Sequence, residues 1–444
     1  MVKKLGLSLL LALPLWMFAQ PQINSPYSRF GFGDIVDSNF NFSQLMGGLG
    51  ASYTSPYDIN IVNPATLPYL TAAGFDIGLH ARLSTLEDSN SRTDGLWSGN
   101  LSYFSLAFPL KNSLNDLLDR KERDVSFGMA FTLKPYSLVG YNISTTTFNE
   151  EIGAVTRSFE GSGGTYDFTW SNGVKYKDFS LGVNLGYLFG KAVRQRIVQF
   201  GDLPTAENSL LDETAHYSGF LWRIGGLYSL KLNDAELRDD KSIPFRKINF
   251  GIHANSRTNF TTDFSAFTGV AQFGTAGAIA QDTFNIDVRD GLAGKLPAEV
   301  GIGATFHSGE KLALGVNYTS TFWSGFSSDV VNEPLNDIQS LSFGGFYRPN
   351  YKSINSYLAR VMYRFGVYYR EVPTEVNFGE RIDDLGVTFG MSLPFFYQRK
   401  ISHAHLGLAA GIRGRDTAIE ERYLQLKFSF TFNDDEWFLK RKYN

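Results

Sequence analysis

A long alternation of bulky apolar residues with small or polar ones constrains this chain more than any other feature. In Phe179–Phe189 every second residue is bulky and apolar, and the residues between are mostly Gly, Ser and Asn; Tyr423–Phe432 and Asp384–Leu393 repeat the pattern. A period of two is typical of a strand with two different faces. The alternation persists for about 10 residues or more, the length of a tilted membrane strand, whereas strands of soluble sandwiches usually have about 5–6. We expect the bulky face to contact lipid and the other face to line a lumen.

The number of such segments predicts the architecture. From about Leu70 to Phe432 the chain holds enough of them for an all-β, antiparallel transmembrane β-barrel of roughly 14 strands. A lumen of that width is too large for the wall's own side chains to fill. The joints between segments are expected to be periplasmic turns at Tyr176–Ser180 and His307–Lys311, extracellular loops at Val193–Asp212 and Phe264–Asp282, and a small periplasmic helix at Lys111–Arg123.

The N-terminus indicates export. Met1–Lys4 is basic, Leu5–Phe18 is apolar, and Ala19 and Gln20 follow, so residues 1–20 are predicted to be a signal peptide; the alternative is a buried N-terminal helix. No later apolar run is long enough for a transmembrane helix. The chain has no Cys and a net charge of −3, which argues against a disulfide framework and a nucleic-acid partner. We therefore expect a protein of the cell outer membrane, in contact with its lipid.

The segment that precedes the strands cannot belong to the wall. Ser43–Leu70 carries Pro56, Pro64 and Pro68, and an irregular backbone at membrane depth is tolerated only where protein or a water-filled cavity surrounds it. We interpret residues 21–69 as a hatch inside the lumen, 70–433 as the barrel, and 434–444 as a periplasmic tail.

At this point the chain resembles a known family. Met46–Leu70, "MGGLGASYTSPYDINIVNPATLPYL", is similar to the N-terminal pattern of the FadL-like long-chain fatty-acid transporters: a Gly/Ala-rich run and then Asn-Pro-Ala. Leu296–Phe326, with Trp323 near its end, is similar to a second family stretch, and "YLARVMYRFGVYY" and the C-terminal stretch resemble members from Bacteroidota. The tail Asp434–Asn444 departs from the many barrels that stop at a terminal aromatic residue. The hatch residues that the resemblance points to are Gly47, Gly48, Gly50, Asn63, Pro64 and Ala65.

The family's fold implies a 14-stranded barrel with a luminal hatch, in which a hydrophobic ligand enters from outside and leaves sideways through a break in the wall. A candidate break lies in the third predicted strand, where clean alternation up to Leu133 is followed by Pro135, Tyr136 and Gly140. Proline has no N–H to donate to a neighbouring strand. The alternative is a bulge or the end of the strand.

Four arginines are candidates for binding a ligand carboxylate. Alternation over Tyr357–Glu371 points Arg360, Arg364 and Arg370 inward, and Arg257 extends the inward face of another strand. Arginine on the lumen side avoids a cost of roughly 2–4 kcal/mol on the lipid side, and it binds carboxylates through charge-assisted hydrogen bonds. The alternative is internal pairing with acids of the hatch or wall, such as Asp76 or Glu299.

No pattern predicts catalysis, a metal or a cofactor. His403 and His405 are the only close histidines, and a solvated pair is favoured over a metal site. The sequence therefore predicts a non-enzymatic channel for passive uptake of long-chain fatty acids or other hydrophobic small molecules. The alternative is a non-transporting accessory or scaffold barrel, with protein subunits of a Bacteroidota secretion or outer-membrane assembly complex as partners.

Overall fold

The computed structural model describes residues 23–434 except 111–123, 204–206, 241–242, 275–276, 332, 377–379 and 398–399. The predictions of a signal peptide, of a helix at Lys111–Arg123 and of a tail after Asp434 lie outside the described residues. Within the described ranges, no helix has the length and apolar character needed to cross a membrane.

Strands dominate the described chain. The first elements are η2 (Pro26–Arg29), β1 (Asp34–Ile35), α2 (Asn41–Gln44) and η3 (Pro64–Tyr69). The next are β2 (Ala73–Asp88), β3 (Thr93–Pro109), β4 (Val125–Asn149), β5 (Gly153–Tyr176), β6 (Phe179–Phe200), β7 (Asn208–Lys231), α4 (Asp234–Asp239), β8 (Arg246–Asn255) and β9 (Thr258–Gly274). The last are β10 (Gly277–Leu296), β11 (Ala298–Ser308), β12 (Leu312–Phe322), η4 (Trp323–Gly325), β13 (Ser327–Ser328), β14 (Ile338–Tyr347), β15 (Met362–Val376), β16 (Glu380–Tyr397), β17 (Lys400–Arg413) and β18 (Ile419–Asp434).

The strands close into one antiparallel barrel. Of the 18 strands in the described sheet, β1 and β13 are two-residue pieces. β8 and β9 both pair with β7, and β10 and β11 pair in turn with β9 and β8, so each of these two pairs forms one interrupted wall strand. The wall therefore has 14 strands, and it closes where β18 pairs with β2. The predicted fold class is confirmed.

Burial alternates along the wall as the sequence predicts. On β6, Phe179 and Leu181 are exposed while Ser180 and Asn184 are buried. On β18, Leu424 and Leu426 point outward, and their buried neighbours face inward. The bulky apolar face is therefore the outside of the barrel.

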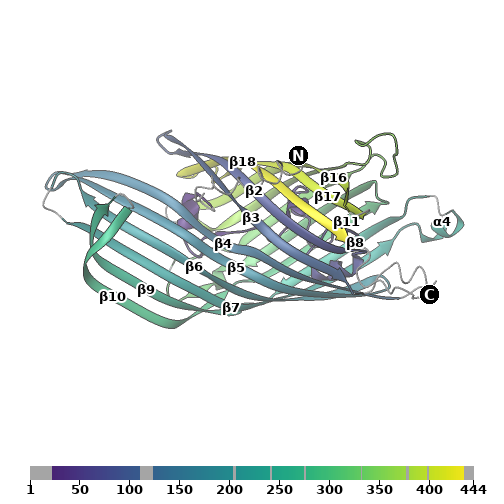
Figure 1. The fold of residues 1–444 in the computed structure, drawn as a ribbon, viewed down its shortest axis with the longest axis horizontal. Helices are drawn as coiled ribbons and strands as arrows, with labels where there is room; N and C mark the ends of the chain where they lie inside the picture. Colours follow the sequence, from purple (N-terminus) through teal and green to yellow (C-terminus); the bar gives the residue numbers. More distant parts are fainter. Residues whose placement is uncertain are drawn as a thin grey trace, which may run out of the picture.

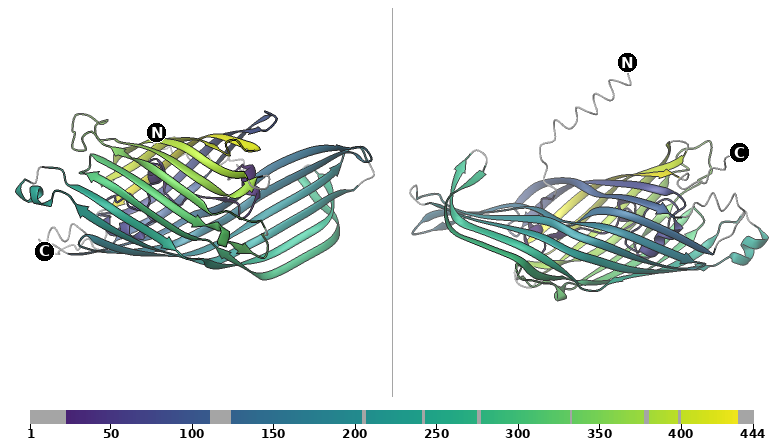
Figure 2. Two further views of the ribbon diagram at one scale, coloured as in Figure 1. Left: turned by 180° about the vertical axis from the view of Figure 1, so that it is seen from behind. Right: turned by 60° about the horizontal axis from the view of Figure 1, so that its bottom comes forward.

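One side of the wall extends far beyond the other. β4, β5, β6 and β7 have 25, 24, 22 and 24 residues, whereas β11 and β12 have 11 each. With β9 and β10, the long strands project as a curved sheet at the end opposite the described C-terminus (Figures 1 and 2). The expectation of long loops at Val193–Asp212 and Phe264–Asp282 is wrong over most of both stretches, because paired strands continue through them. We call this projection the extension, and the end that carries Asp434 the C-terminal end.

The N-terminal elements lie inside the barrel. η2, β1, α2 and η3, drawn in purple, are surrounded by the wall (Figures 1 and 2). Phe42, Met46, Leu49, Ile59 and Leu67 are buried and join wall residues in one apolar cluster. We call residues 23–72 the hatch from here on.

Candidate functional site

The hatch backbone rests directly on glycines of the wall. A Cβ atom on Gly251 would lie 1.9 Å from the Ala51 carbonyl oxygen, and one on Gly366 would lie 2.2 Å from the Gly47 nitrogen. Only glycine permits such a close approach between two backbones. The wall glycines that contact the hatch backbone in this way are Gly128, Gly140, Gly173, Gly182, Gly251, Gly344 and Gly366, whereas Gly225, Gly390 and Gly407 make room for hatch side chains. The glycines of the inner face therefore allow the hatch to pack directly against the wall.

The predicted hatch glycines lie in the turn after α2 and in the irregular segment that follows it. Gly47 and Gly48 have φ values of 75° and 101°, in the left-handed region that favours glycine. Gly50 leaves room for the Asn39 side chain, which approaches to 2.6 Å of where its Cβ atom would be. All three positions thus let the chain reverse while it is enclosed by the wall.

Asn63, Pro64 and Ala65 begin η3 and dock it on the wall. The Asn63 side chain accepts a hydrogen bond from the Ala65 N–H at 3.0 Å and donates to the carbonyls of Ala51 and Gly226 at 2.6 and 3.0 Å. Pro64 occupies the first helical position, where its missing N–H costs nothing. The triplet is therefore a cap that also binds the hatch to β7.

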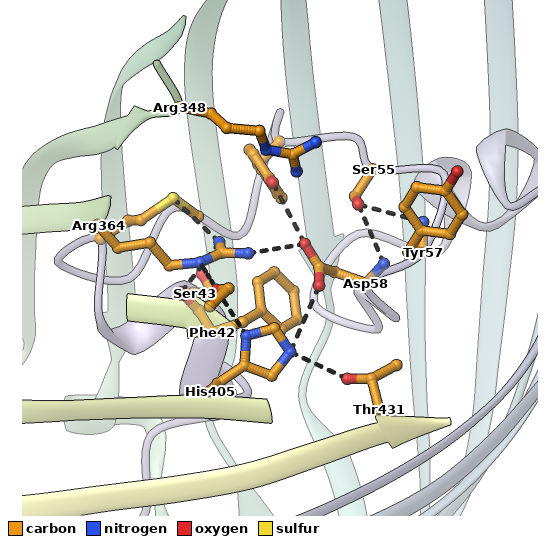
Figure 3. A network of polar contacts seen from close by, with 12 residues as sticks. Phe42, Ser43, Ser55, Tyr57, Asp58, Arg348, Arg364, His405 and Thr431 are labelled. Carbon is orange, nitrogen blue, oxygen red and sulfur yellow. Dashed lines mark hydrogen bonds and ion pairs between the residues drawn. The ribbon is translucent and has the colours of Figure 1, made fainter. Parts of the chain in front are cut away.

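A buried ion pair fastens the hatch to the other side of the wall (Figure 3). Arg364 on β15 has no exposed surface, and its Nη2 lies 2.9 Å from Asp58 Oδ2 of the hatch. Its Nε donates to Ser392 Oγ at 2.7 Å, and its Nη1 donates to the Phe42 carbonyl at 3.4 Å. Nη1 also contacts Met46 Sδ at 3.3 Å, so the guanidinium joins the hatch at three points and the wall at one.

His405 completes this network from β17 (Figure 3). Its Nε2 lies 3.6 Å from Asp58 Oδ1 and 3.0 Å from Thr431 Oγ1, while Nδ1 lies 2.7 Å from Ser392 Oγ. Burial alone would raise the pKa of Asp58, but Arg364 and the nearby histidines outweigh it and hold that pKa well below its usual range. Asp58 is therefore ionised, and the pair stays charged.

Two further ion pairs hold the hatch to the wall at positions closer to the extension. Arg413 forms a bidentate ion pair with Asp34, in which Nη1 and Nη2 each donate to one carboxylate oxygen at 2.8 Å. Arg370 Nη2 lies 2.7 Å from Asp37 Oδ2. Burial opposes ionisation of both aspartates, yet the facing arginines lower the pKa of each. Both acids lie in the hatch, so the chain of ion pairs runs along it.

Many charged groups line the space left above the hatch. A lumen cavity of 330 Å³ is lined by hatch and wall residues, among them the charged groups Asp34, Asp37, Arg82, Lys134, Asp167, Arg223, Glu299, Arg370, Asp384, Arg413 and Lys427. Ligand sites for apolar molecules are lined predominantly by hydrophobic and aromatic side chains. This cavity is therefore poorly matched to a fatty-acid tail.

The predicted break in the wall coincides with a real interruption of strand pairing. β3 pairs with β4 only from Pro109↔Gly128 to Phe104↔Leu133, and the ladder between β4 and β5 shifts register between Pro135 and Ser137. Beyond this point β4 binds the hatch, because β1 pairs with it at Ser137 and Leu138.

Backbone atoms of the candidate gate residues are occupied by hatch groups. The Tyr136 carbonyl accepts from Val36 N–H at 3.0 Å, and the Gly140 carbonyl accepts from Ser25 N–H at 2.9 Å. Ser28 Oγ both accepts from the Gly140 N–H and donates to its carbonyl. The hatch therefore covers the free edge of β4.

Two of the four candidate arginines lie elsewhere than predicted. Arg257 is exposed in the break between β8 and β9 and packs against Gly325, so it does not line the lumen cavity. Arg360 precedes β15, which begins only at Met362, and its guanidinium lies 5.3 Å from the ring of Tyr357 in the same joint. Strand ends depend on the neighbouring strand, and β14 pairs with β15 only up to Tyr363.

The other two arginines, Arg364 and Arg370, point inward, and each pairs with an acid of the hatch rather than with Asp76 or Glu299.

The expectation of a solvated histidine pair is wrong, since His403 and His405 are both buried. Alternation along β17 predicts this burial, because the two histidines share their inward face with the small residues Gly407 and Ala409. Within the described residues, no group of three or more His, Asp or Glu could hold a metal ion.

Comparison with known proteins identifies the family. A family model described as BamG matches residues 1–444. The chain belongs to the BamG family. The FadL-like pattern of this BamG-family chain is thus a likeness in fold, and the family itself is BamG rather than FadL. No curated protein matches the chain.

Solved structures with the same fold are distant in sequence. A FadL homologue from Pseudomonas aeruginosa has 13% identity and a TM-score of 0.57, covering 90% of this chain and 99% of its own. The toluene transporter TodX from P. putida has 16% identity and a TM-score of 0.55, with the same coverage. The toluene transporter TbuX from Ralstonia pickettii has 13% identity and a TM-score of 0.51, again with 90% and 99% covered. Together they show that this BamG-family barrel has the FadL-like fold.

Proposed function

We propose that this BamG-family protein is a closed-lumen accessory subunit of an outer-membrane assembly complex, with its C-terminal end in the periplasm. The observation that carries the proposal is the way the hatch is fastened. Asp58 and Asp37 pair with Arg364 and Arg370, both on wall strand β15. Asp34 pairs with Arg413 on wall strand β17. A hatch held by three ion pairs, of which Arg364–Asp58 is buried on both sides, suits a permanent part of the wall better than a moving gate.

The lumen and the family support the same function. The cavity above the hatch is lined by many charged groups, which a hydrophobic substrate does not need. The family name BamG hints at a role in assembly. The fold of a transporter is no obstacle, because one fold can host unrelated functions.

Outer surfaces on the extension also fit a protein partner. Phe284, Ile286 and Val288 are more than half exposed at alternate positions of β10. Val288 lies 12 residues before Val300 of β11, so at about 3.3 Å per residue this row is roughly 40 Å along the strand from the apolar outer face of β11. Large apolar side chains outside a membrane belt commonly mark protein contacts.

Co-purification tests the proposal. The tagged protein is extracted from its own membranes in a mild detergent, and the associated chains are quantified. We expect outer-membrane assembly subunits in stoichiometric amounts. An isolated barrel that carries only bound lipid would overturn the proposal and favour a transporter.

A second function is favoured by one specific observation. The interruption between β3 and β4 lies where a sideways exit would be, and among the described residues it is hatch segments that cover it. A passive channel for long-chain fatty acids or other hydrophobic molecules would require the hatch to leave that edge. The two functions therefore differ in whether the hatch moves.

A reversible cross-link separates the two functions. Ile35 and Ser137 are paired residues of β1 and β4, and paired Cα atoms in antiparallel strands lie about 4.5–5.5 Å apart, within disulfide range. The chain has no Cys of its own, so Ile35→Cys with Ser137→Cys forms one defined bond. We expect the oxidised variant to keep its subunits and to show no loss of oleate uptake. Uptake that falls on oxidation and returns on reduction would instead establish the channel.

A further inference from the structure

A second, smaller cavity opens beside the hatch at the C-terminal end of the barrel. It measures 260 Å³ and lies between the hatch turn Tyr53–Asp58 and the wall strands β8, β11, β14, β15 and β17. Glu310, in the turn between β11 and β12, and Arg348, just after β14, also line it. One water needs about 10–15 Å³ by this kind of measure, so the cavity has room for a small organic molecule.

Two buried histidines in its lining have a ring nitrogen without a partner. His307 Nε2 and His403 Nδ1 make no hydrogen bond within the described part of the chain, although both residues are more than nine-tenths buried. His307 stacks on Tyr53 with 5.8 Å between ring centres, and His403 lies 5.6 Å from Tyr57. Buried polar groups are nearly always satisfied, so an unpartnered pair in one cavity indicates a missing polar ligand.

The charges around the cavity favour an anion. Its lining holds the cations Lys247, Arg348 and Arg364 and the acids Glu310 and Asp58. Arg348 pairs with Glu310 at 3.0 Å and Arg364 with Asp58 at 2.9 Å, whereas Lys247 has no acid within ion-pair distance in the described chain. The Nζ of Lys247 contacts only Thr54 Oγ1, at 3.3 Å, and the ring faces of Tyr69 and Phe245. One positive charge is therefore left over.

Apolar surface completes the lining. Tyr53, Phe346 and Met362 are buried beside the histidines. Lys175 adds a second cation to the ring of Tyr69, 4.3 Å from its centre. A small inorganic ion would leave the aromatic part of this cavity unused.

We propose that this cavity binds an organic carboxylate with a short aromatic or apolar body. Lys247 Nζ, with the unpartnered nitrogens of His307 and His403, receives the carboxylate oxygens, and the apolar body lies against Tyr53 and Phe346. Neither transport nor complex membership is needed for this site, so it goes beyond the proposed function and does not rest on it. A ligand here contacts the hatch turn that carries Asp58, and thus stabilises the docked hatch.

Calorimetric titration of the full-length protein in detergent with 3-phenylpropionate tests the site. We expect saturable binding that also raises the melting temperature. Lys247→Met should weaken binding at least about tenfold, the lower end for loss of a hydrogen bond to a charged group. Lys247→Arg keeps the charge and should retain most of the affinity. His403→Phe keeps an aromatic ring beside Tyr57 and should also weaken binding.

Matched ligands and a matched variant supply the controls. Lys311→Met removes a lysine at the same end but outside the cavity lining and should leave the affinity unchanged. Circular dichroism checks that each variant is folded. Absence of saturable binding to the parent protein would overturn the proposal. Equal binding of 3-phenylpropanol would contradict a carboxylate site, and equal binding of inorganic phosphate would contradict the apolar part.

Discussion

Arg364 shows how much of the hatch depends on single residues. It is fully buried, and its guanidinium reaches Asp58, Phe42 and Ser392 at once. A buried ion pair is weak evidence of net stabilisation, because desolvation opposes the attraction between the charges. Removing one partner is different, since an unpaired charge then stays buried.

Substitution of Asp58 tests this asymmetry. Asp58→Asn should lower the free energy of unfolding by about 3–5 kcal/mol, because Arg364 is left without its counter-charge. Denaturant unfolding measures the loss. The control Asp234→Asn, at an exposed position of α4, should change stability by less than about 0.5 kcal/mol. A loss of the same small size at both positions would show that the pair does not anchor the hatch.

The close packing of the hatch on the wall glycines is tested by adding a single methyl group. Gly251→Ala places a Cβ atom against the Ala51 carbonyl, and overpacking of this kind typically costs about 1–3 kcal/mol. Gly95→Ala is the matched control, because nothing lies within 4 Å of its Cβ position. Thermal unfolding of the two variants should therefore differ. Equal melting temperatures would mean that the hatch yields at Gly251 without cost.

At the scale of elements, the hatch and β4 depend on each other. β4 leaves β3 after Leu133, and β1 and η2 then bind its free edge. Unpaired backbone groups facing lipid cost several kcal/mol each, so an uncovered edge at membrane depth would be expensive. The hatch thus fills the lumen and also supplies hydrogen bonds to the free edge of β4.

Deletion of the central hatch separates these two tasks. A protein that lacks Asn41–Thr66 keeps η2 and β1 on β4 but loses α2 and the first half of η3. We expect it to fold as a barrel and to conduct ions in planar bilayers, because a lumen of this width is no longer filled. A folded deletion protein that conducts no more than its parent would show that the remaining side chains close the lumen.

At the scale of the whole molecule, the barrel is lopsided. The extension is formed by β4–β7, β9 and β10, so the strands on this side of the barrel reach further from the C-terminal end than those on the other side (Figure 2). If the C-terminal end faces the periplasm, the extension projects from the cell surface. This asymmetry gives the protein one large surface outside the membrane, on which a partner can bind.

Epitope tags test that orientation. A tag between Glu150 and Glu151 lies in the joint of β4 and β5 at the tip of the extension, and one between Asn350 and Tyr351 lies in the joint of β14 and β15 at the C-terminal end. Antibodies do not cross the outer membrane, so intact cells should be stained only through the first tag. Permeabilised cells should show both. Staining of intact cells through the second tag alone would reverse the orientation.

The sequence by itself determined the wall and excluded the hatch from it. Alternation in Phe179–Phe189 is a local property, since a strand places successive side chains on opposite faces whatever its neighbours are. The barrel class, its 14 strands and the outward face could therefore be predicted. The prolines of Ser43–Leu70 acted just as locally, because a proline cannot donate to a ladder.

Only the tertiary structure decided which groups meet. Arg364 pairs with Asp58, 306 residues away, and no local pattern encodes that partner. Arg360 and Arg257 fall outside the lumen because a strand ends where its neighbour stops pairing. Val193–Asp212 reads as a loop, yet most of it is strand because β6 and β7 supply each other's hydrogen bonds. Such contacts are set by the closure of the whole barrel, a condition that no short stretch of sequence contains.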